Sequence, residues 1–433
     1  MKNSVCIIGL GYVGLTLSLK FCQKNFQVIG YDTDKKIISD LKNSKSHVFE
    51  EGLDKNLKKY INNKKFKPVN EIPKKLNTYI ITVGTPIVKK NNIYKPNLEH
   101  IKNVTTKLSK IIKINSLLIY RSTLPLGSSR NVIYKLLKKN NKIQSKFLLG
   151  FAPERTAEGK ALKELSKLPQ IVSGIDSASL AKTSNLFKKI CDEVIEVDSL
   201  EEAELIKLTN NAYRDLSFAF SNQIALICSK FDINANRLIN FCNYKYPRSL
   251  VPMPSPGVGG PCLTKDPYIL NYSLKDKRSI FSYGREINDK ILDHLIVNSL
   301  NKINNAKIDV KKNILFCGLS FKGYPVTKDL RGSAFIMFYK KYLKNKNTQL
   351  FYYDKLFNKN DLLNYQIKEF QFKDKIKFDA IFFLNNSPIL KKISIKNINK
   401  VISKKTHIFD FWRIIHNSKN KLKTKNYYEI GQI

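Results

Sequence analysis

The sequence has few histidines and no metal-type cysteine pattern, and both shortages narrow the chemistry that the chain can perform. Its five histidines all lie outside the glycine, cysteine and lysine motifs of the chain. A histidine-based hydride-transfer enzyme is therefore disfavoured. The seven cysteines include no C-x-x-C pair and no histidine neighbour at zinc-ligand spacing. We therefore expect no metal site.

Long hydrophobic runs and signs of secretion are also missing. No run reaches the roughly 18 apolar residues that a membrane-spanning helix needs. The apolar stretch from Val5 to Leu19 contains three regularly spaced glycines and no small-residue cleavage site, unlike a signal peptide. An odd number of cysteines also argues against a disulfide framework. We expect a soluble, cytoplasmic protein with reduced thiols and no membrane partner.

Acidic side chains are scarce relative to basic ones: 35 oppose 76, giving a formal net charge of +41. Such a surplus invites a nucleic-acid interpretation, because lysine-rich surfaces bind polyanions. The lysines are spread over the whole length, often beside asparagine, and surround no nucleic-acid-binding motif. We expect a solvated basic surface that attracts anionic ligands and no nucleic-acid partner. A basic nucleotide-binding protein remains an alternative.

Buried-strand runs punctuate the first part of the 433-residue chain, which is long enough for two or three domains. They lie at 5–8, 27–31, 78–83, 116–120, 147–151 and 170–173. Helical stretches alternate with these runs, and each run is apolar throughout. This pattern predicts a parallel sheet covered on both faces. We assign residues 1–199 to this first domain.

A helical pattern replaces the strands from about residue 200 to 231. Its apolar residues recur at three- and four-residue steps: Leu205, Leu208, Ala212, Leu216, Ala219 and Leu226. More helix follows to about 304, interrupted by a proline- and glycine-rich loop at 247–267. Strand runs then restart at 314–317, 350–354, 380–384 and 407–411. The predicted fold is α/β, with Rossmann-like sheet domains at 1–199 and 306–433 joined by a central helical domain at 200–305 that contains a long spine helix.

A glycine motif, G-x-G-x-x-G, directly follows the first predicted strand and opens the first helix. Gly9 permits a tight turn, Gly11 lets backbone approach a pyrophosphate, and Gly14 allows close packing of helix on sheet. Asp32 ends the second strand, where an acidic group accepts hydrogen bonds from an adenosine ribose and repels a 2′-phosphate. This context predicts a dinucleotide site that prefers NAD to NADP and includes Tyr12 and Val13.

Glycines precede Cys262, and charged residues follow it. The run from Gly257 to Gly260 gives a substrate room to approach the sulfur, and the nearby cation Lys265 favours a thiolate. The alternative, an ordinary cysteine in a loop, suits Cys6, Cys22 and Cys317 better, because they lie inside strands or helices. We therefore interpret Cys262 as a nucleophile.

Other candidate residues lie on the spine helix and in loops after strands. Lys207 and Asn211 are four residues apart on one helix face and could hold an oxyanion, although a solvated face is the simpler interpretation. Loops after strands line ligand sites in α/β proteins. The residues of this kind are Thr85, Ser122 and Thr123, the carboxylates Glu154 and Glu158, and the phosphate-compatible cations Lys322, Lys328 and Arg331.

Taken in order, these segments resemble the UDP-glucose/GDP-mannose dehydrogenase family over roughly residues 2–415. The resemblance includes the glycine motif with its acidic residue and the V-G-T-P turn. It continues with R-S-T-L-P-L-G at 121–127, A-P-E-R-T-A-E-G at 152–159 and E-A-E-L-I-K-L-T-N-N at 202–211, and ends with G-V-G-G-P-C-L-T-K-D at 257–266 and F-K-G at 321–323.

The resemblance implies a two-step, NAD-dependent oxidation of a nucleotide sugar. Cys262 resembles the nucleophile that captures the intermediate aldehyde as a thiohemiacetal, which a second oxidation converts to a thioester that water hydrolyses to a uronate. Lys207 and Asn211 resemble the residues that stabilise the oxyanions. Asp266 and Thr123 resemble those that position and activate water, and Glu154 resembles the residue that assists hydrolysis.

The resemblance also implies binding residues and an assembly. Glu158 and Arg331 resemble NAD contacts. Residues expected at the sugar nucleotide, besides Glu154, Lys207 and Asn211, are Arg155, Arg248, Gly259, Lys322 and Arg413, with Arg248 reaching a neighbouring subunit's substrate. The long helix of the family builds a dimer, so we expect a homodimer or a dimer of dimers.

Three positions depart from the commonest family pattern and bear on which sugar is oxidised. Arg121 stands where many relatives have glutamate, Pro261 where histidine or serine often precedes the cysteine, and Gly332 where glutamate often follows the arginine. The P-E-R and G-V-G-G features favour a UDP-N-acetylhexosamine, whereas A-E-G suits UDP-glucose, so a UDP-glucose 6-dehydrogenase is the alternative. A rival of another class is a single-step β-hydroxyacid-type dehydrogenase, which does not need Cys262.

Overall fold

The computed structural model describes residues 3–74, 76–90, 93–140, 146–274, 278–304, 311–344 and 347–433. The chain divides into two compact units. The first comprises Met1–Asn211 with Lys265–Lys277, and the second comprises Ala212–Thr264 with Arg278–Ile433. Each is described by itself. The division into three domains stays a prediction, because both the spine helix and the cysteine loop contribute to the two units.

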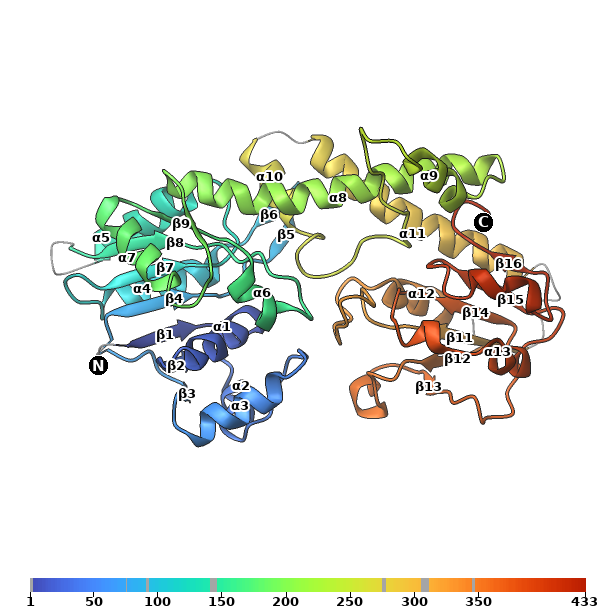
Figure 1. Cartoon of the computed structure of the whole chain (residues 1–433), viewed down its shortest axis with the longest axis horizontal. Coiled ribbons are helices and arrows are strands. Elements are labelled where there is room, and N and C mark those ends of the chain that lie inside the picture. The colour runs from blue at the N-terminus through green and yellow to red at the C-terminus, as the bar shows by residue number, and fades with distance from the viewer. Residues whose placement is uncertain are drawn as a thin grey trace. The chain divides into compact units, whose positions relative to one another are not determined.

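The first unit is built on a sheet whose described part has the strand order β10-β9-β8-β7-β4-β1-β2-β3 (Figure 1). In chain order these strands are β1 (Ser4–Ile8), β2 (Gln27–Tyr31), β3 (Phe66–Val69), β4 (Thr78–Ile81), β7 (Leu117–Tyr120), β8 (Leu148–Phe151), β9 (Gln170–Gly174) and β10 (Val194–Glu196). Neighbouring strands are parallel except β8 and β9, which pair antiparallel. The predicted sheet is confirmed; the short strands β3 and β10, each at an edge, were not predicted.

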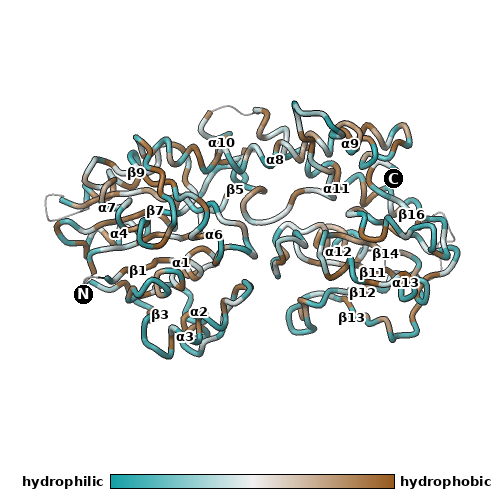
Figure 2. Tube along the Cα trace, viewed as in Figure 1, coloured by the Kyte–Doolittle hydropathy of each residue, from teal (hydrophilic) through white to brown (hydrophobic). Residues whose placement is uncertain are grey.

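Both faces of this sheet are buried, because its strands are apolar at successive positions (Figure 2). Val5 and Ile7 of β1 enter one hydrophobic cluster, whereas Cys6 and Ile8 enter another. Side chains alternate between the faces of a strand, so each cluster lies on its own face. The helices of this unit are α1 (Tyr12–Gln23), α2 (Lys35–Lys42), α3 (Leu53–Asn62), α4 (Glu99–Ser109), α5 (Lys135–Asn140), α6 (Ala161–Lys167), α7 (Ser177–Phe187) and α10 (Asp266–Ser273), with the π-helix η1 (Ser129–Tyr134) before α5. An antiparallel hairpin of β5 (Ile87–Lys90) and β6 (Ile93–Pro96) was not predicted.

The long helix α8 (Leu200–Lys230), green in Figure 1, confirms the predicted spine helix. Its residues up to Asn211 belong to the first unit and the rest to the second. Leu208, Ala212 and Leu226 are buried as their spacing predicted, but Leu205 is 39% exposed, so its assignment to the apolar face was wrong. Helices α9 (Ala235–Asn243) and α11 (Ile280–Asn304) follow in the second unit.

The second unit contains a sheet in the order β13-β12-β11-β14-β15-β16, and every described pair in it is parallel. Its strands are β11 (Lys312–Cys317), β12 (Thr348–Tyr353), β13 (Lys368–Glu369), β14 (Ala380–Phe383), β15 (His407–Asp410) and β16 (Tyr427–Tyr428), with helices α12 (Ala334–Leu343) and α13 (Ile395–Val401). The four predicted strands are confirmed. The two-residue edge strands β13 and β16 carry no apolar run, and the sequence did not predict them.

Across the described part of the chain, helices that are both long and apolar enough to cross a membrane are absent.

Candidate active site

The glycine motif forms a tight turn between β1 and α1. Gly9 adopts a φ of +92°, which favours glycine, and its N–H donates to the Tyr31 carbonyl at 2.8 Å. A Cβ on Gly14 would lie 1.8 Å from the Gly9 carbonyl oxygen, whereas a Cβ on Gly11 would meet nothing within 4 Å. The turn is therefore closed toward the sheet and open above Gly11, at the start of α1, where a phosphate can accept backbone N–H groups.

Asp32 lies at the end of β2 beside this turn. Its carboxylate accepts N–H groups from Leu10 at 2.7 Å and Asp34 at 3.0 Å. A cavity of about 340 Å³ opens here, and its lining includes Gly9, Gly11, Asp32, Thr82, His100 and Lys107. The predicted cofactor residues Gly9, Gly11 and Asp32 therefore line one cavity. Its dimensions and its backbone donors fit one end of a dinucleotide.

Tyr12 ties the same helix to Glu50, a carboxylate that no sequence motif marks. The Tyr12 hydroxyl donates to Glu50, and both groups accept the Gly159 N–H, at 2.8 Å for Tyr12 and 2.9 Å for Glu50. Burial and the adjacent Glu50 raise the pKa of Tyr12 well above its ordinary value. Glu50 lies in a loop without a recognisable pattern, so the sequence offered no signal for this contact.

The loops after β4 and β7 are joined to each other. Thr85 Oγ1 donates to the Thr123 carbonyl at 2.6 Å, and Ser122 Oγ donates to the Val83 carbonyl at 2.6 Å. The structure thus brings the predicted residues Thr85 and Thr123 together. Val13, predicted with the cofactor residues, lies on the first turn of α1.

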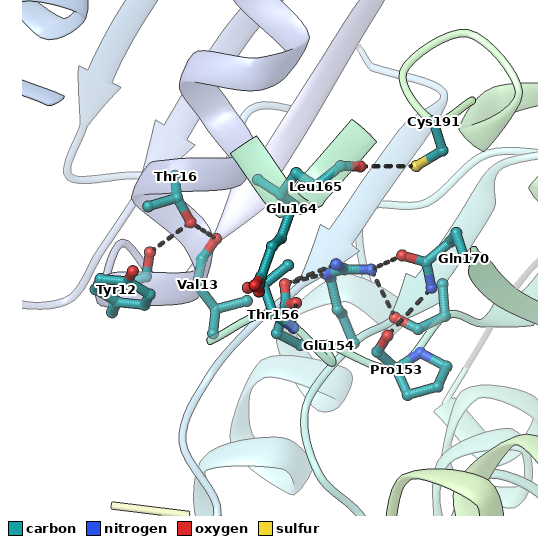
Figure 3. A network of polar contacts seen from close by, with 12 residues as sticks. Tyr12, Val13, Thr16, Pro153, Glu154, Thr156, Glu164, Leu165, Gln170 and Cys191 are labelled. Atoms are coloured by element: carbon teal, nitrogen blue, oxygen red, sulfur yellow. Dashed lines mark hydrogen bonds and ion pairs between the residues drawn. The ribbon is translucent and has the colours of Figure 1, made fainter. Parts of the chain in front are cut away.

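Glu154 is buried in an ion pair with Arg121, whose Nε and Nη2 both donate to Glu154 Oε2, at 3.0 and 2.6 Å. The Thr156 N–H donates to the other oxygen at 2.7 Å. Burial alone would raise the pKa of Glu154, but Arg121 and Thr156 hold it below its ordinary value. Figure 3 shows Glu154 beside Gln170, which accepts from Arg121 Nη1 at 2.8 Å. Arg121, to which the sequence analysis gave no role in the site, is thus the main partner of Glu154.

Two neighbours of Glu154 were also predicted to bind ligands. Arg155 donates to the Pro169 carbonyl, and burial lowers its pKa. Glu158 is partly buried in the loop that precedes α6. Arg155 therefore holds the protein's own backbone, and its expected contact with a substrate stays a prediction.

Asn211 and Asp266 meet inside the first unit. Asn211 Nδ2 donates to Asp266 Oδ2 at 2.6 Å, and Lys265 Nζ pairs with Asp266 Oδ1 at 2.6 Å. Asp266 is fully buried, and Asn211 and Lys207 are each 8% exposed. Lys207 is therefore not on the solvated helix face that was the simpler interpretation. The pairing of Asn211 with Asp266 was not visible in the sequence, because 55 residues separate them.

Glu204, one turn before Lys207 on α8, fixes the loop after β7. Its carboxylate accepts the Gly127 N–H at 2.5 Å and the Ser129 N–H at 2.7 Å, and the side chain is 1% exposed. Burial raises its pKa to about 7. Glu204 thereby joins the helix of Lys207 and Asn211 to the loop of Thr123.

Cys262 is exposed, unlike most of the cysteines. Five are buried: Cys6, Cys22, Cys191, Cys228 and Cys317. Burial raises the pKa of each of these five thiols, to about 12 for Cys22 and about 11 for Cys191. Only Cys242 shares the exposure of Cys262. Because reactive thiols need access and thiolate character, the structure leaves these two as candidate nucleophiles.

The glycines ahead of Cys262 pack against the loops after β11. A Cβ on Gly259 would lie 2.1 Å from the Gly332 carbonyl oxygen, and the Gly260 N–H donates to the Arg331 carbonyl at 2.9 Å. Backbone approach therefore requires glycine at Gly259. The backbone of Gly332, and not an open substrate cavity, lies beside this position.

The predicted cations of the second unit occupy different surroundings. Lys322 Nζ lies 5.4 Å from the centre of the Phe321 ring, and Arg331 pairs with Asp329 at 2.5 Å. Arg413 adopts a φ of +54° with its Nε 3.8 Å from Glu429, and the exposed Arg248 lies over Tyr246. None of these contacts tests the NAD or sugar-nucleotide binding that the sequence predicted for these four cations.

Known proteins similar in sequence to this chain are nucleotide-sugar dehydrogenases. Residues 3–191 match the NAD binding domain of the UDP-glucose/GDP-mannose dehydrogenase family, and residues 201–290 match its central domain. The UDP-N-acetyl-D-mannosamine dehydrogenase of Campylobacter jejuni is 30% identical over 356 residues, 80% of this chain and 85% of that protein. The protein of that name from Methanocaldococcus jannaschii is 31% identical over 319 residues, covering 74% and 72%.

Solved structures share the fold over almost the whole length. A UDP-D-ManNAc dehydrogenase from Pyrococcus horikoshii has a TM-score of 0.85 at 24% identity and covers 99% of each chain. A UDP-glucose dehydrogenase from Pyrobaculum islandicum has a TM-score of 0.82 at 17% identity and covers 100% of this chain and 98% of its own.

The glycine turn, its helix and the acidic residue after β2 define a dinucleotide-binding α/β oxidoreductase. The family matches make the class specific: the chain belongs to the UDP-glucose/GDP-mannose dehydrogenase family.

Proposed function

We propose that this enzyme oxidises the C6 hydroxymethyl group of a UDP-N-acetylhexosamine, with UDP-N-acetylmannosamine favoured, to the uronate. The similar proteins from C. jejuni and M. jannaschii, both named UDP-N-acetyl-D-mannosamine dehydrogenase, support this substrate class over UDP-glucose. The observation that carries the two-step chemistry is the exposed thiol of Cys262 in a glycine-bounded loop.

In the proposed reaction Cys262 acts between two oxidations. The alcohol first loses a hydride and a proton to become an aldehyde. The thiolate then forms a C–S bond to the aldehyde carbon, and the oxygen takes a proton to complete the thiohemiacetal. Loss of a second hydride and a proton leaves a thioester. Water adds to its carbon and the C–S bond breaks, so that the carboxylate and one proton leave and the Cys262 thiol is regenerated.

The buried residues of the first unit support this chemistry. Lys207 and Asn211 stabilise negative charge on the reacting oxygen, because a cation and an amide donor are both held away from bulk water. Asp266 orients Asn211 through their 2.6 Å hydrogen bond and, with Thr123, positions the hydrolytic water. Glu154 accepts three hydrogen bonds from Arg121 and Thr156, which hold its pKa below its ordinary value, so we propose that it acts through its charge and position and is a weak base.

We propose NAD as the cofactor of both oxidations. It supplies the hydride acceptor for each oxidation. Backbone N–H groups above Gly11 would hold its pyrophosphate, and Asp32 would accept from its ribose and repel a 2′-phosphate. Tyr12, Val13 and Thr85 would line the rest of the site, and Glu158 and Arg331 would add polar contacts.

The nucleotide sugar would be bound mainly through its anionic and hydroxyl groups. Lys322 and Arg413 supply cations for the pyrophosphate and uridine, and Arg155 and the Gly259 backbone contact the sugar. Arg248, exposed near α9, would reach the substrate of a neighbouring subunit.

A homodimer would bury an apolar row on the spine helix. Tyr213, Phe220 and Ile227 recur every seventh residue of α8 and are 72%, 56% and 46% exposed, and Phe231 and Phe241 are also exposed. Apolar side chains at this spacing form one helix face suited to a second helix. Sedimentation velocity of the wild type and of Phe220→Glu tests this: the dimer should dissociate in the variant.

The reaction is tested by counting NADH. A panel of UDP- and GDP-sugars is supplied singly with NAD, and two NADH should form per UDP-N-acetylhexosamine consumed, because an alcohol is oxidised twice. Cys262→Ser should lose uronate formation while NAD still binds, and Cys242→Ser, the matched control with an exposed thiol, should keep it. One NADH per turnover, or normal uronate output from Cys262→Ser, contradicts the proposal.

A further inference from the structure

A buried ion pair in the second unit holds the loop that leads to Cys262. Asp215 on α8 and Arg285 on α11 lie 2.6 Å apart, with side chains 1% and 3% exposed. Arg285 Nη1 also donates to the Val258 carbonyl at 3.3 Å. Val258 lies four residues before Cys262. The guanidinium therefore connects two helices to the backbone of the cysteine loop.

A second arm of the same network reaches the loop further upstream. The Ser255 N–H donates to Asn222 Oδ1 at 2.9 Å, and Asn222 Nδ2 donates to Asn288 Oδ1 at 2.8 Å. Asn288 Nδ2 in turn donates to Asp215 Oδ1 at 3.0 Å. Asn222 and Asn288 are fully buried. The loop is thus held at two backbone positions by one continuous set of buried polar side chains.

Close packing also holds the loop at Gly259 and Gly260. A Cβ on Gly260 would lie 2.6 Å from Phe321 Cε2, and one on Gly259 would lie 2.1 Å from the Gly332 carbonyl oxygen. These two positions therefore leave no room for a side chain, and the loop backbone packs closely on Phe321 and Gly332. The hydrogen bonds at Ser255 and Val258 and this close packing together hold the loop.

The network is poorly explained by stability alone. Removing two charges from water costs several kcal/mol per ion, and buried ion pairs are often replaced by apolar side chains without loss. Burial raises the pKa of Asp215 even though Arg285 lies beside it. The ion pair instead fixes geometry. The planar Arg285 guanidinium donates to Asp215, Val258 and Asp289 in fixed directions.

We infer that Arg285, held by Asp215, is a positioning residue that sets the place of the Cys262 loop for aldehyde capture. The inference rests on the proposed thioester chemistry. Misplacing a nucleophile slows only the steps that use it. Loss of the network should therefore slow the second oxidation and release aldehyde, while the first oxidation and dinucleotide binding continue.

The test uses the full chain in a Cys242→Ser background, so that Cys262 is its one exposed thiol among the described residues. The double variant Asp215→Asn/Arg285→Gln removes both charges and leaves neither unpaired. Arg285→Lys keeps the charge but loses the planar fork. Asp289→Asn is the matched control. It removes the other carboxylate partner of Arg285, and the Asp289 side chain is 65% exposed. The rate of Cys262 alkylation by iodoacetamide and the ratio of aldehyde to uronate in a single turnover are measured.

In the double variant we expect the second oxidation to slow about 10- to 100-fold, with free aldehyde detected. The alkylation rate should change at least about threefold, because thiol reactivity follows its surroundings. Dinucleotide affinity should stay within about twofold, since no proposed cofactor residue belongs to the network. Arg285→Lys should fall between, and Asp289→Asn should match the wild type.

A folded double variant with wild-type alkylation rate and product ratio overturns the inference. Should the double variant not fold, Asn222→Ala breaks the link to Ser255 without touching a charge, and the same unchanged readings overturn the inference there. Alkylation needs no turnover, so it reports on positioning even if Cys262→Ser were to retain uronate formation, the outcome that contradicts the proposed function.

Discussion

The two sheets of this protein begin with nearly the same turn and then diverge. In the first, Gly9 donates to Tyr31 and Leu10 donates to Asp32; in the second, Gly318 donates to Tyr353 at 3.2 Å and Leu319 donates to Asp354 at 2.9 Å. Both glycines have positive φ, +92° and +84°. Counting strands along each sheet and setting the β5–β6 hairpin aside, the order third, second, first, fourth, fifth, sixth is shared. This agreement indicates that one architecture was used twice in the chain.

The difference lies in the segment after the turn. Helix α1 begins at Tyr12, directly after the first turn, whereas α12 begins only at Ala334, after a loop that carries Lys322. A helix N-terminus offers backbone N–H groups to a phosphate, whereas a lysine offers a point charge on a flexible stem. We therefore expect the first sheet to bind a dinucleotide and the second to bind a differently shaped anion.

Individual loops of the two sheets are held by different chemistry. In the first sheet, buried ionisable side chains hold loops through Arg121 with Glu154 and through Glu204. In the second sheet, a neutral amide holds the loop after Lys322, because Asn386 Oδ1 accepts the Gly323 and Tyr324 N–H groups at 2.9 and 3.0 Å. Buried carboxylates hold other loops of the second sheet, as Asp410 does through the Ile414 and Ile415 N–H groups. Changes at Arg121 and Glu204 should therefore cost more stability and depend more on pH than a change at Asn386.

The largest effect is expected from Arg121→Met. It leaves Glu154 buried without its cation, and breaking a buried pair in this way costs about 3–5 kcal/mol of unfolding free energy. Arg130→Met is the matched control, because its partner Glu201 forms an exposed pair worth at most about 1 kcal/mol. Urea unfolding at pH 7 measures both. Equal losses in the two variants would contradict the asymmetry between buried and exposed charge.

A pH dependence is expected from Glu204. Its pKa of about 7 in the folded state lies above the ordinary 4.5, so folding favours the protonated form. The stability that this group contributes is complete below about pH 4.5 and is lost as pH rises through 7. At about 1.4 kcal/mol per pKa unit the loss is about 3 kcal/mol. Glu204→Gln should remove this slope from urea unfolding measured between pH 5 and 8.

The matched control for Glu204→Gln is Glu201→Gln on the same helix. Glu201 is held below its ordinary pKa by its Arg130 hydrogen bond, so its slope has the opposite sign and lies at lower pH. If Glu204→Gln and the wild type lose stability in parallel across this range, burial does not govern the Glu204 carboxylate.

Asp32 and Asp354 occupy equivalent places but should differ in function. Asp32→Asn removes the charge that repels a 2′-phosphate, so we expect the ratio of kcat/KM for NAD over NADP to fall at least about tenfold, or about 1.4 kcal/mol. Asp354→Asn should leave this ratio unchanged. Burial raises the pKa of Asp354 despite its backbone donors and Lys328. Initial rates with NAD and with NADP give this ratio for each variant. A fall of similar size in the Asp354 variant would show that the second turn also binds a dinucleotide.

The sequence predicted the central strands and the spine helix because each is a continuous or periodic apolar pattern. It missed the edge strands β3, β10, β13 and β16, which are short and partly exposed and carry little apolar signal. The same limit applies to the site. Gly9, Asp32 and Cys262 stand in local motifs, whereas the partners of Tyr12, Glu154 and Asn211 lie 38, 33 and 55 residues away and depend on tertiary folding.

The smallest effect is expected from Asn386→Ala in the second sheet. The side chain accepts two backbone N–H groups of the loop that follows Lys322, and losing a neutral acceptor costs about 1 kcal/mol. Asn399→Ala is the matched control: Asn399 lies on α13, and its side chain also contacts backbone, at Lys421 and Lys423, away from Lys322. Both variants should be destabilised equally at pH 5 and pH 8, because an amide does not titrate.

Only Asn386→Ala should also raise the KM for the UDP-sugar, severalfold, with the KM for NAD unchanged, because only its loop positions Lys322. Steady-state kinetics with each substrate varied in turn separates the two constants. A rise in the KM for NAD would show that the amide-held loop serves the dinucleotide as well, and the division of labour between the two sheets would then be wrong.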